Sequence, residues 1–178
     1  MERIEIPFRL LNHTLVFQKL VKGALLCAGD LQHHNCMTIG WATIGVLWQR
    51  NVMIIYVRPT RYTYEFMNSS SDFTVSFIPP DMQIALDYCG THSGREGDKL
   101  AACELTLAPS QCIVSPGIDQ ADLIFECVTL YRQDFDHNFF LDPSLEQMYP
   151  RKDYHRQYIG EIVRIEGSEN FTSKPGPS

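Results

Sequence analysis

Val52-Met53-Ile54-Ile55-Tyr56-Val57 is a nearly continuous run of apolar and β-branched residues. Such a run is typical of a β-strand that is covered on both faces, as in the interior of a barrel or a sandwich. Residues 73–78 instead alternate strictly, which predicts a half-buried strand with Phe73, Val75 and Phe77 facing the core. The two segments together predict a protein made mainly of β-strands.

Further strands and a few short helices surround these two segments in the sequence. The other segments with strand composition are residues 25–28, 36–44, 124–131 and 158–165. The segments with helix signals are residues 63–68, 80–88, 96–102 and 143–148. Many short strands with few helices favour an antiparallel β-barrel that carries peripheral helices.

The length and composition fit one domain. The chain has 178 residues, of which 44% are hydrophobic; this is enough for a sizeable core and too many for a disordered chain. We place the single domain at residues 1–167. Residues 168–178 are polar and include Pro175, Gly176 and Pro177, so we expect a disordered tail there.

The net charge of −6 argues against a general nucleic-acid binder, which needs an excess of lysine and arginine. It leaves room for a local basic pocket that binds one small anion. No apolar run approaches the roughly 18 residues of a membrane span, and the charged N-terminus does not resemble a signal peptide. The six cysteines form no Cys-x-x-Cys pair. We therefore expect a cytoplasmic protein with reduced thiols, several of them in the core.

Two stretches carry the residue types that bind a phosphate monoester. Residues 35–43 read Asn-Cys-Met-Thr-Ile-Gly-Trp-Ala-Thr, and residues 58–63 read Arg-Pro-Thr-Arg-Tyr-Thr at a junction between a strand and a helix. Phosphate is bound by backbone N–H groups at a helix N-terminus, by hydroxyls and by planar guanidinium groups. In the alternative interpretation, Arg58 and Arg61 are surface arginines and Thr63 only caps the helix.

Two other stretches are distinctive, although neither defines a reaction by itself. Residues 93–99, Ser-Gly-Arg-Glu-Gly-Asp-Lys, form a turn-rich loop, which on its charge alone would be a solvated loop. His155 precedes a strand that Gly160 interrupts, and a glycine inside a strand indicates a bulge or the close approach of another group. The spacing of the histidines predicts no metal site. The sequence also lacks a nucleophile elbow, a Gly-x-Gly-x-x-Gly fingerprint and a Walker loop, so nucleotide binding would need another scaffold.

These four stretches, in this order, resemble the flavin reductase-like family of FMN-binding split barrels, and in particular its flavoredoxin and ferric-reductase-like branch. The resemblance covers residues 20 to 167. It is carried by residues 35–43, 61–63 with 73–76, 93–99 and 158–161. The resemblance implies a six-stranded antiparallel split β-barrel with a few peripheral helices, a homodimer, and FMN bound tightly near the dimer interface.

The resemblance also implies roles for individual residues. Those expected along the flavin ring and ribityl chain are Asn35, Met37, Thr38, Trp41, Ala42 and Thr43. Those expected around the ribityl phosphate are Arg58, Arg61, Tyr62 and Thr63. Those expected on the other side of the ring are Cys89, Gly90, Ser93, Gly94 and Lys99. His155 is expected at the edge of the ring, close to where a nicotinamide or an electron acceptor docks, and is the one catalytic candidate.

The function implied by the resemblance is that of an FMN-dependent oxidoreductase. It would take hydride from NADH or NADPH and pass electrons to free flavin, to a ferric chelate or to a protein acceptor, while the protein orients the flavin. The alternative is an electron-carrier module that holds FMN and is reduced only by a protein partner. A third possibility is a barrel that retains the fold for protein interaction and binds no cofactor. Neither nucleic acid nor a membrane is expected as a partner.

Overall fold

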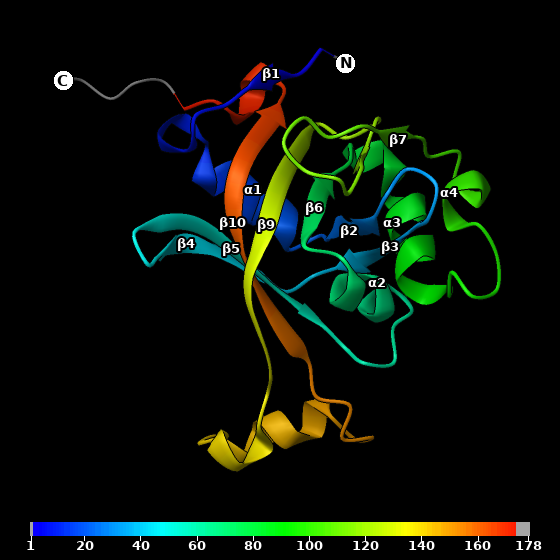
Figure 1. Cartoon of the computed structure of the whole chain (residues 1–178), viewed down its shortest axis with the longest axis vertical. Coiled ribbons are helices and arrows are strands. Elements are labelled where there is room, and N and C mark those ends of the chain that lie inside the picture. The colour runs from blue at the N-terminus through cyan, green and yellow to red at the C-terminus, as the bar shows by residue number, and fades with distance from the viewer. Residues whose placement is uncertain (1, 174–178) are drawn as a thin grey trace.

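The computed structural model describes residues 2–173, and its centre is one twisted antiparallel sheet (Figure 1). Along the main path of the sheet the strands pair in the order β3-β2-β6-β9-β10-β5-β4, and β1 adds to β10. The strands of this sheet are β1 (Ile4–Glu5), β2 (Ala24–Gly29), β3 (His34–Ile39), β4 (Ala42–Leu47), β5 (Arg50–Val57), β6 (Asp72–Phe77), β9 (Leu123–Asp134) and β10 (Arg156–Gly167). Strands β3 and β5 also contact each other although they are distant in the pairing order, so the sheet curls into a split barrel.

All six expected strands are present, but the expected count of six is too low. The run at residues 36–44 is divided, because β3 ends at Ile39 and β4 begins at Ala42. The break at Gly40 lets the chain leave β2 and pair with β5, where Ala42 lies opposite Ile55. The short strand β1 is the other addition to the sheet. The prediction of a mainly β, antiparallel split barrel is confirmed.

The apolar core occupies both faces of the sheet. Phe73, Val75 and Phe77 point into the larger cluster, as the alternation predicts. The prediction that β6 is half-buried is wrong, because all six of its residues are buried. On its other face Thr74 donates a hydrogen bond to the carbonyl of Pro116 (2.6 Å), and Ser76 accepts one from the amide of Ile118 (3.2 Å). A loop that contains β7 (Leu107–Ala108) and β8 (Gly117–Ile118) thus covers the polar side of this strand.

The helices are short and lie around the sheet. They are α1 (His13–Leu20), α2 (Thr63–Ser69), α3 (Gln83–Thr91) and α4 (Lys99–Ala102), with 3-10 turns η1 (Phe8–Leu10), η2 (Pro80–Met82), η3 (His137–Phe139), η4 (Pro143–Met148) and η5 (Glu169–Phe171). Helix α4 begins later than expected because Asp98 caps it, accepting hydrogen bonds from the amides of Leu100 and Ala101. Helix α1 was not predicted; Asn12 caps it, and Val16 and Leu20 are its buried residues.

Gly160 lies where another group approaches closely, as its position inside a strand indicates. A Cβ atom at this position would lie 2.6 Å from Cζ of Phe73 and 3.0 Å from Cβ of Cys127. The pairing of β10 with β9 also shifts between Ile159 and Gly160, which marks a bulge. Both features expected of a strand glycine are therefore present.

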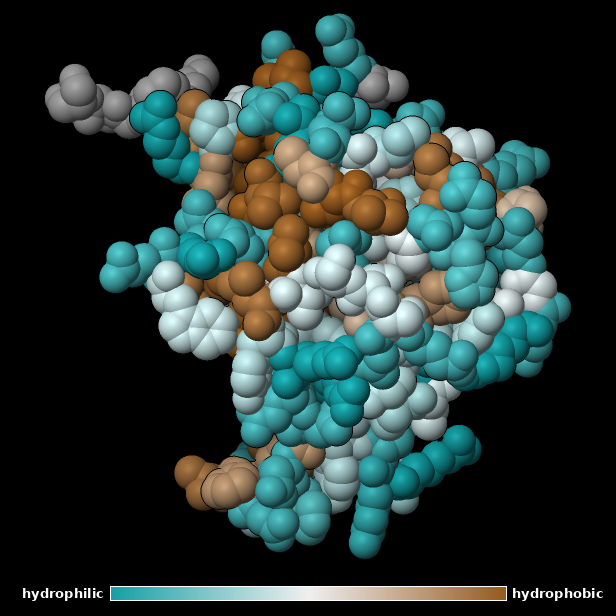
Figure 2. All heavy atoms as spheres, in the orientation of Figure 1, coloured by the Kyte–Doolittle hydropathy of each residue, from teal (hydrophilic) through white to brown (hydrophobic). Residues whose placement is uncertain are grey.

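Residues 135–154 form an arm that connects β9 to β10. In Figure 1 the arm is the yellow-to-gold segment that projects below the body, carried by the lower ends of these two strands. The 3-10 turns η3 and η4 lie within it. Figure 2 shows brown, hydrophobic atoms at its outer end. The arm is the part of the fold that extends furthest from the core.

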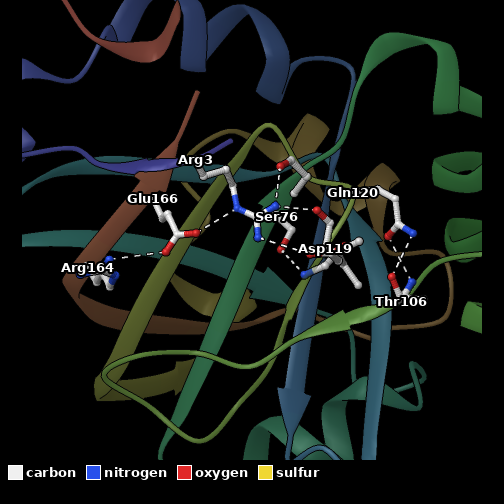
Figure 3. Close-up of polar contacts among 9 residues, drawn as sticks. Arg3, Ser76, Thr106, Asp119, Gln120, Arg164 and Glu166 are labelled. Atoms are coloured by element: carbon white, nitrogen blue, oxygen red, sulfur yellow. Dashed lines mark hydrogen bonds and ion pairs between the residues drawn. The ribbon is translucent and has the colours of Figure 1, made fainter. Parts of the chain in front are cut away.

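Both ends of the described chain are attached to the body. Nε of Arg3 donates to the carboxylate of Glu166 (3.0 Å), and Nη1 donates to the carbonyl of Ala121 (3.1 Å) (Figure 3). The disordered tail was expected to begin at residue 168, which is too early. Phe171 is buried, and a β-bridge joins Thr172 to Leu11, so the ordered structure extends beyond residue 168. Residues 174–178 lie outside the described residues. No helix within residues 2–173 is long and apolar enough to cross a membrane.

Candidate functional site

A polar hollow of about 420 Å³, here called the first hollow, lies where β3 and β5 end. It combines three hydroxyls, an indole ring, two guanidinium groups and an imidazole from separate parts of the sequence. Its lining consists of Met37, Thr38, Ile39, Gly40, Trp41, Tyr56, Arg58, Thr60, Arg61 and His155. The fold therefore brings together residues from three of the four stretches that the sequence singles out.

Arg61 is the free cation of this hollow. Its Nη2 donates a hydrogen bond to the carbonyl of Gly90 (2.6 Å), which holds the guanidinium against the end of α3. Among the described residues no carboxylate forms an ion pair with Arg61. A guanidinium has five N–H donors, and that of Arg61 is only half-buried. Arg61 therefore has donors and a positive charge left for an anion.

Arg58 is engaged within the protein and differs from Arg61 in this respect. Its Nη1 pairs with the carboxylate of Asp153 (3.0 Å), and its Nη2 donates to the carbonyl of Met148 (2.8 Å). The guanidinium also lies over the ring of Tyr149, 5.0 Å from its centroid. Arg58 therefore anchors the arm to the barrel, and its charge is already compensated.

His155 is a neutral, buried imidazole beside Trp41. The residue is 8% exposed, and the two ring centroids are 4.7 Å apart. Burial, together with the nearby positive charge of Arg58 and Arg61, lowers the pKa of His155 to about 4, although Asp153 opposes this shift. Burial also raises the pKa of Tyr149. The Tyr149 hydroxyl and Nδ1 of His155 form a hydrogen bond (2.9 Å) between two buried neutral groups.

The lowered pKa of His155 predicts a pH dependence of stability. Protonation costs more in the folded than in the unfolded protein, so stability that is present above pH 6.5 is lost as the pH falls towards about 4. We expect the His155→Gln variant to lose less unfolding free energy over this range than the wild type, measured by urea unfolding at several pH values. An NMR titration of the His155 ring should have its midpoint near pH 4. A midpoint near 6.5 would contradict the assignment of a buried neutral ring.

A second hollow of about 490 Å³, separate from the first, holds several other expected residues. Asn35, Tyr62, Gly94 and Lys99 contribute to its lining. Nδ2 of Asn35 donates to the hydroxyl of Thr63 (2.6 Å), and both residues are buried. Nζ of Lys99 donates to the carbonyl of Cys89 (3.2 Å). The side chains of Asn35, Thr63 and Lys99 therefore already have partners within the protein.

The remaining expected residues lie apart from the first hollow or beneath its surface. Thr43 lines a separate apolar hollow beside α1, and Ala42 lines both that hollow and the apolar groove next to Trp41. Cys89 is fully buried, and Ser93 accepts a hydrogen bond from the amide of Arg95 (3.2 Å). Within one chain, the structure therefore does not bring Thr43 or Cys89 to the surface of the first hollow.

Among the residues of this region that were not predicted from the sequence are Tyr56, Thr60 and Tyr149. Tyr56 is two residues before Arg58, so the twofold periodicity of a strand could have placed both on one face. Thr60 belongs to the quoted stretch 58–63, but its hydroxyl was not singled out. Tyr149 belongs to the arm, and no sequence pattern connects it with His155. Only the fold reveals that contact.

The buried cysteines behave as core residues. The sulfur atoms of Cys36 and Cys89 lie 3.9 Å apart. The thiol of Cys27 and burial raise the pKa of Cys36, and the thiol of Cys36 and burial raise that of Cys89, so neither is a reactive thiolate. Cys27 and Cys127 are also buried. Within residues 2–173 no group of three or more histidine, cysteine or acidic residues could hold a metal ion.

The split barrel and its polar hollow define a class of small β-barrel domain without a Rossmann fold. Residues 20–175 match the profile of the flavin reductase like domain. This chain belongs to that family.

Individual relatives are distant. An uncharacterized protein of Pyrococcus abyssi is 25% identical over 126 residues, which are 70% of this chain and 72% of that protein. The crystal structure of a flavoredoxin from Methanosarcina acetivorans has a TM-score of 0.67 at 22% identity and covers 100% of this chain and 82% of its own. The FMN-binding domain of a flavin reductases-like enzyme from Shewanella baltica has a TM-score of 0.68 at 16% identity, covering 93% and 77%. At these identities the structures show the shared fold.

Proposed function

We propose that the protein binds FMN in the first hollow and acts as an oxidoreductase. The observation that carries the proposal is the uncompensated guanidinium of Arg61 in one hollow with the indole of Trp41. FMN has an anionic phosphate and a flat aromatic ring, so a cation beside an aromatic surface suits both of its ends. Family membership supports the proposal, as does the likeness to proteins described as FMN-binding.

Some residues of the chain would bind FMN, and others would shield its ring from water. Arg61 would bind the phosphate, and the hydroxyl of Thr60 would assist it. Thr38 donates its hydroxyl hydrogen to the carbonyl of Leu86, so its oxygen remains free to accept a hydrogen bond. Trp41 and Met37 would cover the ring and exclude water. The neutral His155 would border the ring, where its imidazole would position the second substrate. Bound FMN would supply hydride and single-electron transfer.

The proposed hydride donor is NADH or NADPH, and the proposed acceptor is free flavin, a ferric chelate or a protein. A single experiment separates this reductase from the carrier module. Purified protein is loaded with FMN, freed of excess, and mixed anaerobically with NADH or NADPH while the flavin absorbance is followed. We expect rapid bleaching with at least one of the two nucleotides. If the oxidised spectrum persists, the protein is a carrier that needs a protein donor. A colourless protein whose melting temperature is unchanged by added FMN would overturn the proposal.

The proposal includes a homodimer. Within one chain Trp41 remains partly exposed at the edge of the first hollow, so one side of the proposed ring site is open to water. Another subunit would close this side. The expected result in analytical ultracentrifugation is a particle with twice the chain's mass of 20.4 kDa.

A further inference from the structure

The outer surface of the arm carries several exposed apolar side chains. Leu141 is 97% exposed and Phe139 is 79% exposed. Leu145 and Met148, in the next turn of the arm, are also exposed. Figure 2 shows brown, hydrophobic atoms on the arm below the body. Contiguous exposed apolar surface of this kind marks an interaction site in a folded protein.

The arm is internally ordered, so these side chains are held in place. Phe140, Tyr149 and Tyr154 pack together, with ring centroids 5.0 to 6.0 Å apart. The hydroxyl of Tyr154 donates to the carboxylate of Glu146 (3.0 Å). Arg58 anchors the base of the arm to the barrel. Phe139 and Leu141 are thus presented on the outside of a structured tip, and docking would not require the tip to fold first.

An apolar groove of about 400 Å³ lies between α1, the break at Gly40 and Phe135, the first residue of the arm. On α1 and just after it, Phe17 is 69% exposed and Val21 is 74% exposed. The groove is lined by Phe17, Leu20, Val21, Gly40, Trp41, Ala42, Tyr56 and Phe135. Gly40, Trp41 and Tyr56 also line the first hollow, so the groove adjoins the proposed flavin site.

We propose that the tip of the arm docks in the apolar groove of a second copy of this chain. The second copy docks its own arm in the groove of the first in the same way. This inference rests on the homodimer proposed above and names the surfaces that form it. A second copy is favoured because one sequence carries both an apolar projection and an apolar groove. A twofold dimer pairs each with its counterpart and leaves neither exposed. The charges of the two surfaces are also complementary. Asp136 and Asp142 flank the tip, and the exposed Lys22 follows Val21 beside the groove.

The docked arm would complete the candidate site. Covering Trp41 from the groove side removes water from one wall of the first hollow, which strengthens the electrostatic interactions inside it. The partner's Leu141 and Phe139 would therefore contribute to FMN binding without contacting the phosphate. Dimerisation and cofactor affinity are expected to change together in variants of either surface.

The first test measures assembly. Leu141→Asp and Val21→Asp each place a charge on one of the two surfaces, and because both positions are exposed the fold should be retained. We expect both variants to sediment as monomers and to bind FMN roughly tenfold more weakly than the wild type. The matched control is Ile84→Asp on α3, which is 83% exposed and lies on neither surface. It should stay dimeric. Dimeric Leu141→Asp and Val21→Asp proteins would overturn the proposal.

The second test measures contact directly. In a Cys112→Ser background, which removes the exposed cysteine, a Leu141→Cys/Val21→Cys chain is treated with a short bismaleimide. We expect a covalent dimer from the double variant and none from a Leu141→Cys/Val163→Cys chain, whose second cysteine lies on β10 away from the groove. Cross-linking of the control alone would place the arm on another surface and overturn the inference. Protein that binds FMN but sediments as a monomer would refute the arm exchange alone, and a cross-linked protein without FMN affinity would refute only the cofactor proposal.

Discussion

Replacing Arg61 by alanine is expected to weaken FMN binding roughly 10- to 100-fold. A charge-assisted hydrogen bond contributes about 1.5–3 kcal/mol, and about 1.4 kcal/mol corresponds to a factor of ten. Among the described residues Arg61 has no carboxylate partner, so a bound phosphate would gain the full benefit of its charge. Fluorescence titration of the apoprotein with FMN measures the change.

Riboflavin, which lacks the phosphate, is the matched ligand for this test. We expect the wild type and Arg61→Ala to bind riboflavin with similar affinity, because the phosphate contact is missing in both complexes. Arg50→Ala is the matched protein control, since Arg50 is exposed and pairs with Glu161 on the outside of the barrel. Equal loss of affinity for FMN and riboflavin would show that Arg61 supports the fold of the site and does not bind the phosphate.

Replacing Gly160 by valine is expected to lower the free energy of unfolding by about 3 kcal/mol, at the upper end of the range for overpacked cores. For a chain of this length that change lowers the melting temperature by about 6–12 °C. The cause is steric, because even a Cβ atom at Gly160 would lie 2.6 Å from the buried ring of Phe73. Differential scanning calorimetry provides the measurement.

Gly45→Val is the matched control because Gly45 also lies in a strand and a Cβ atom there would have no neighbour within 4 Å. We expect this variant to be as stable as the wild type or slightly more stable, since valine favours strands. Adding Phe73→Leu to Gly160→Val should restore part of the lost stability. If both glycine variants melted at the same temperature, the contact with Phe73 would not be the reason for the glycine.

The strands could be predicted because each is a local pattern of a few residues. The alternation in β6 identified which side chains face the larger core, but not that its hydroxyl side is covered as well. That cover comes from Pro116 and Ile118, some forty residues further along the chain. The break at Gly40 was missed for a similar reason. Residues 36–44 have strand composition throughout, and the choice of two different pairing partners is not visible in composition.

The candidate site shows the same limit. The residue types in 35–43 and 58–63 indicated anion binding, and Thr38, Trp41, Arg58 and Arg61 do line one hollow. The sequence did not distinguish the two arginines. Asp153 lies 95 positions from Arg58, and that contact compensates the charge of Arg58 while Arg61 keeps its own. Thr63 likewise has the right chemistry, yet its hydroxyl is committed to Asn35.

The sequence by itself determined the class of fold, the segments that form the strands and the family resemblance, because periodicity and short motifs depend on neighbouring residues. The tertiary structure alone decided which polar groups have partners and which remain free for a ligand. It also revealed the arm, whose exposed Leu141 and buried Tyr149 occur in one loop of mixed composition. Burial and ion pairing depend on contacts between residues that are distant in the chain, and such contacts exist only once the barrel has closed.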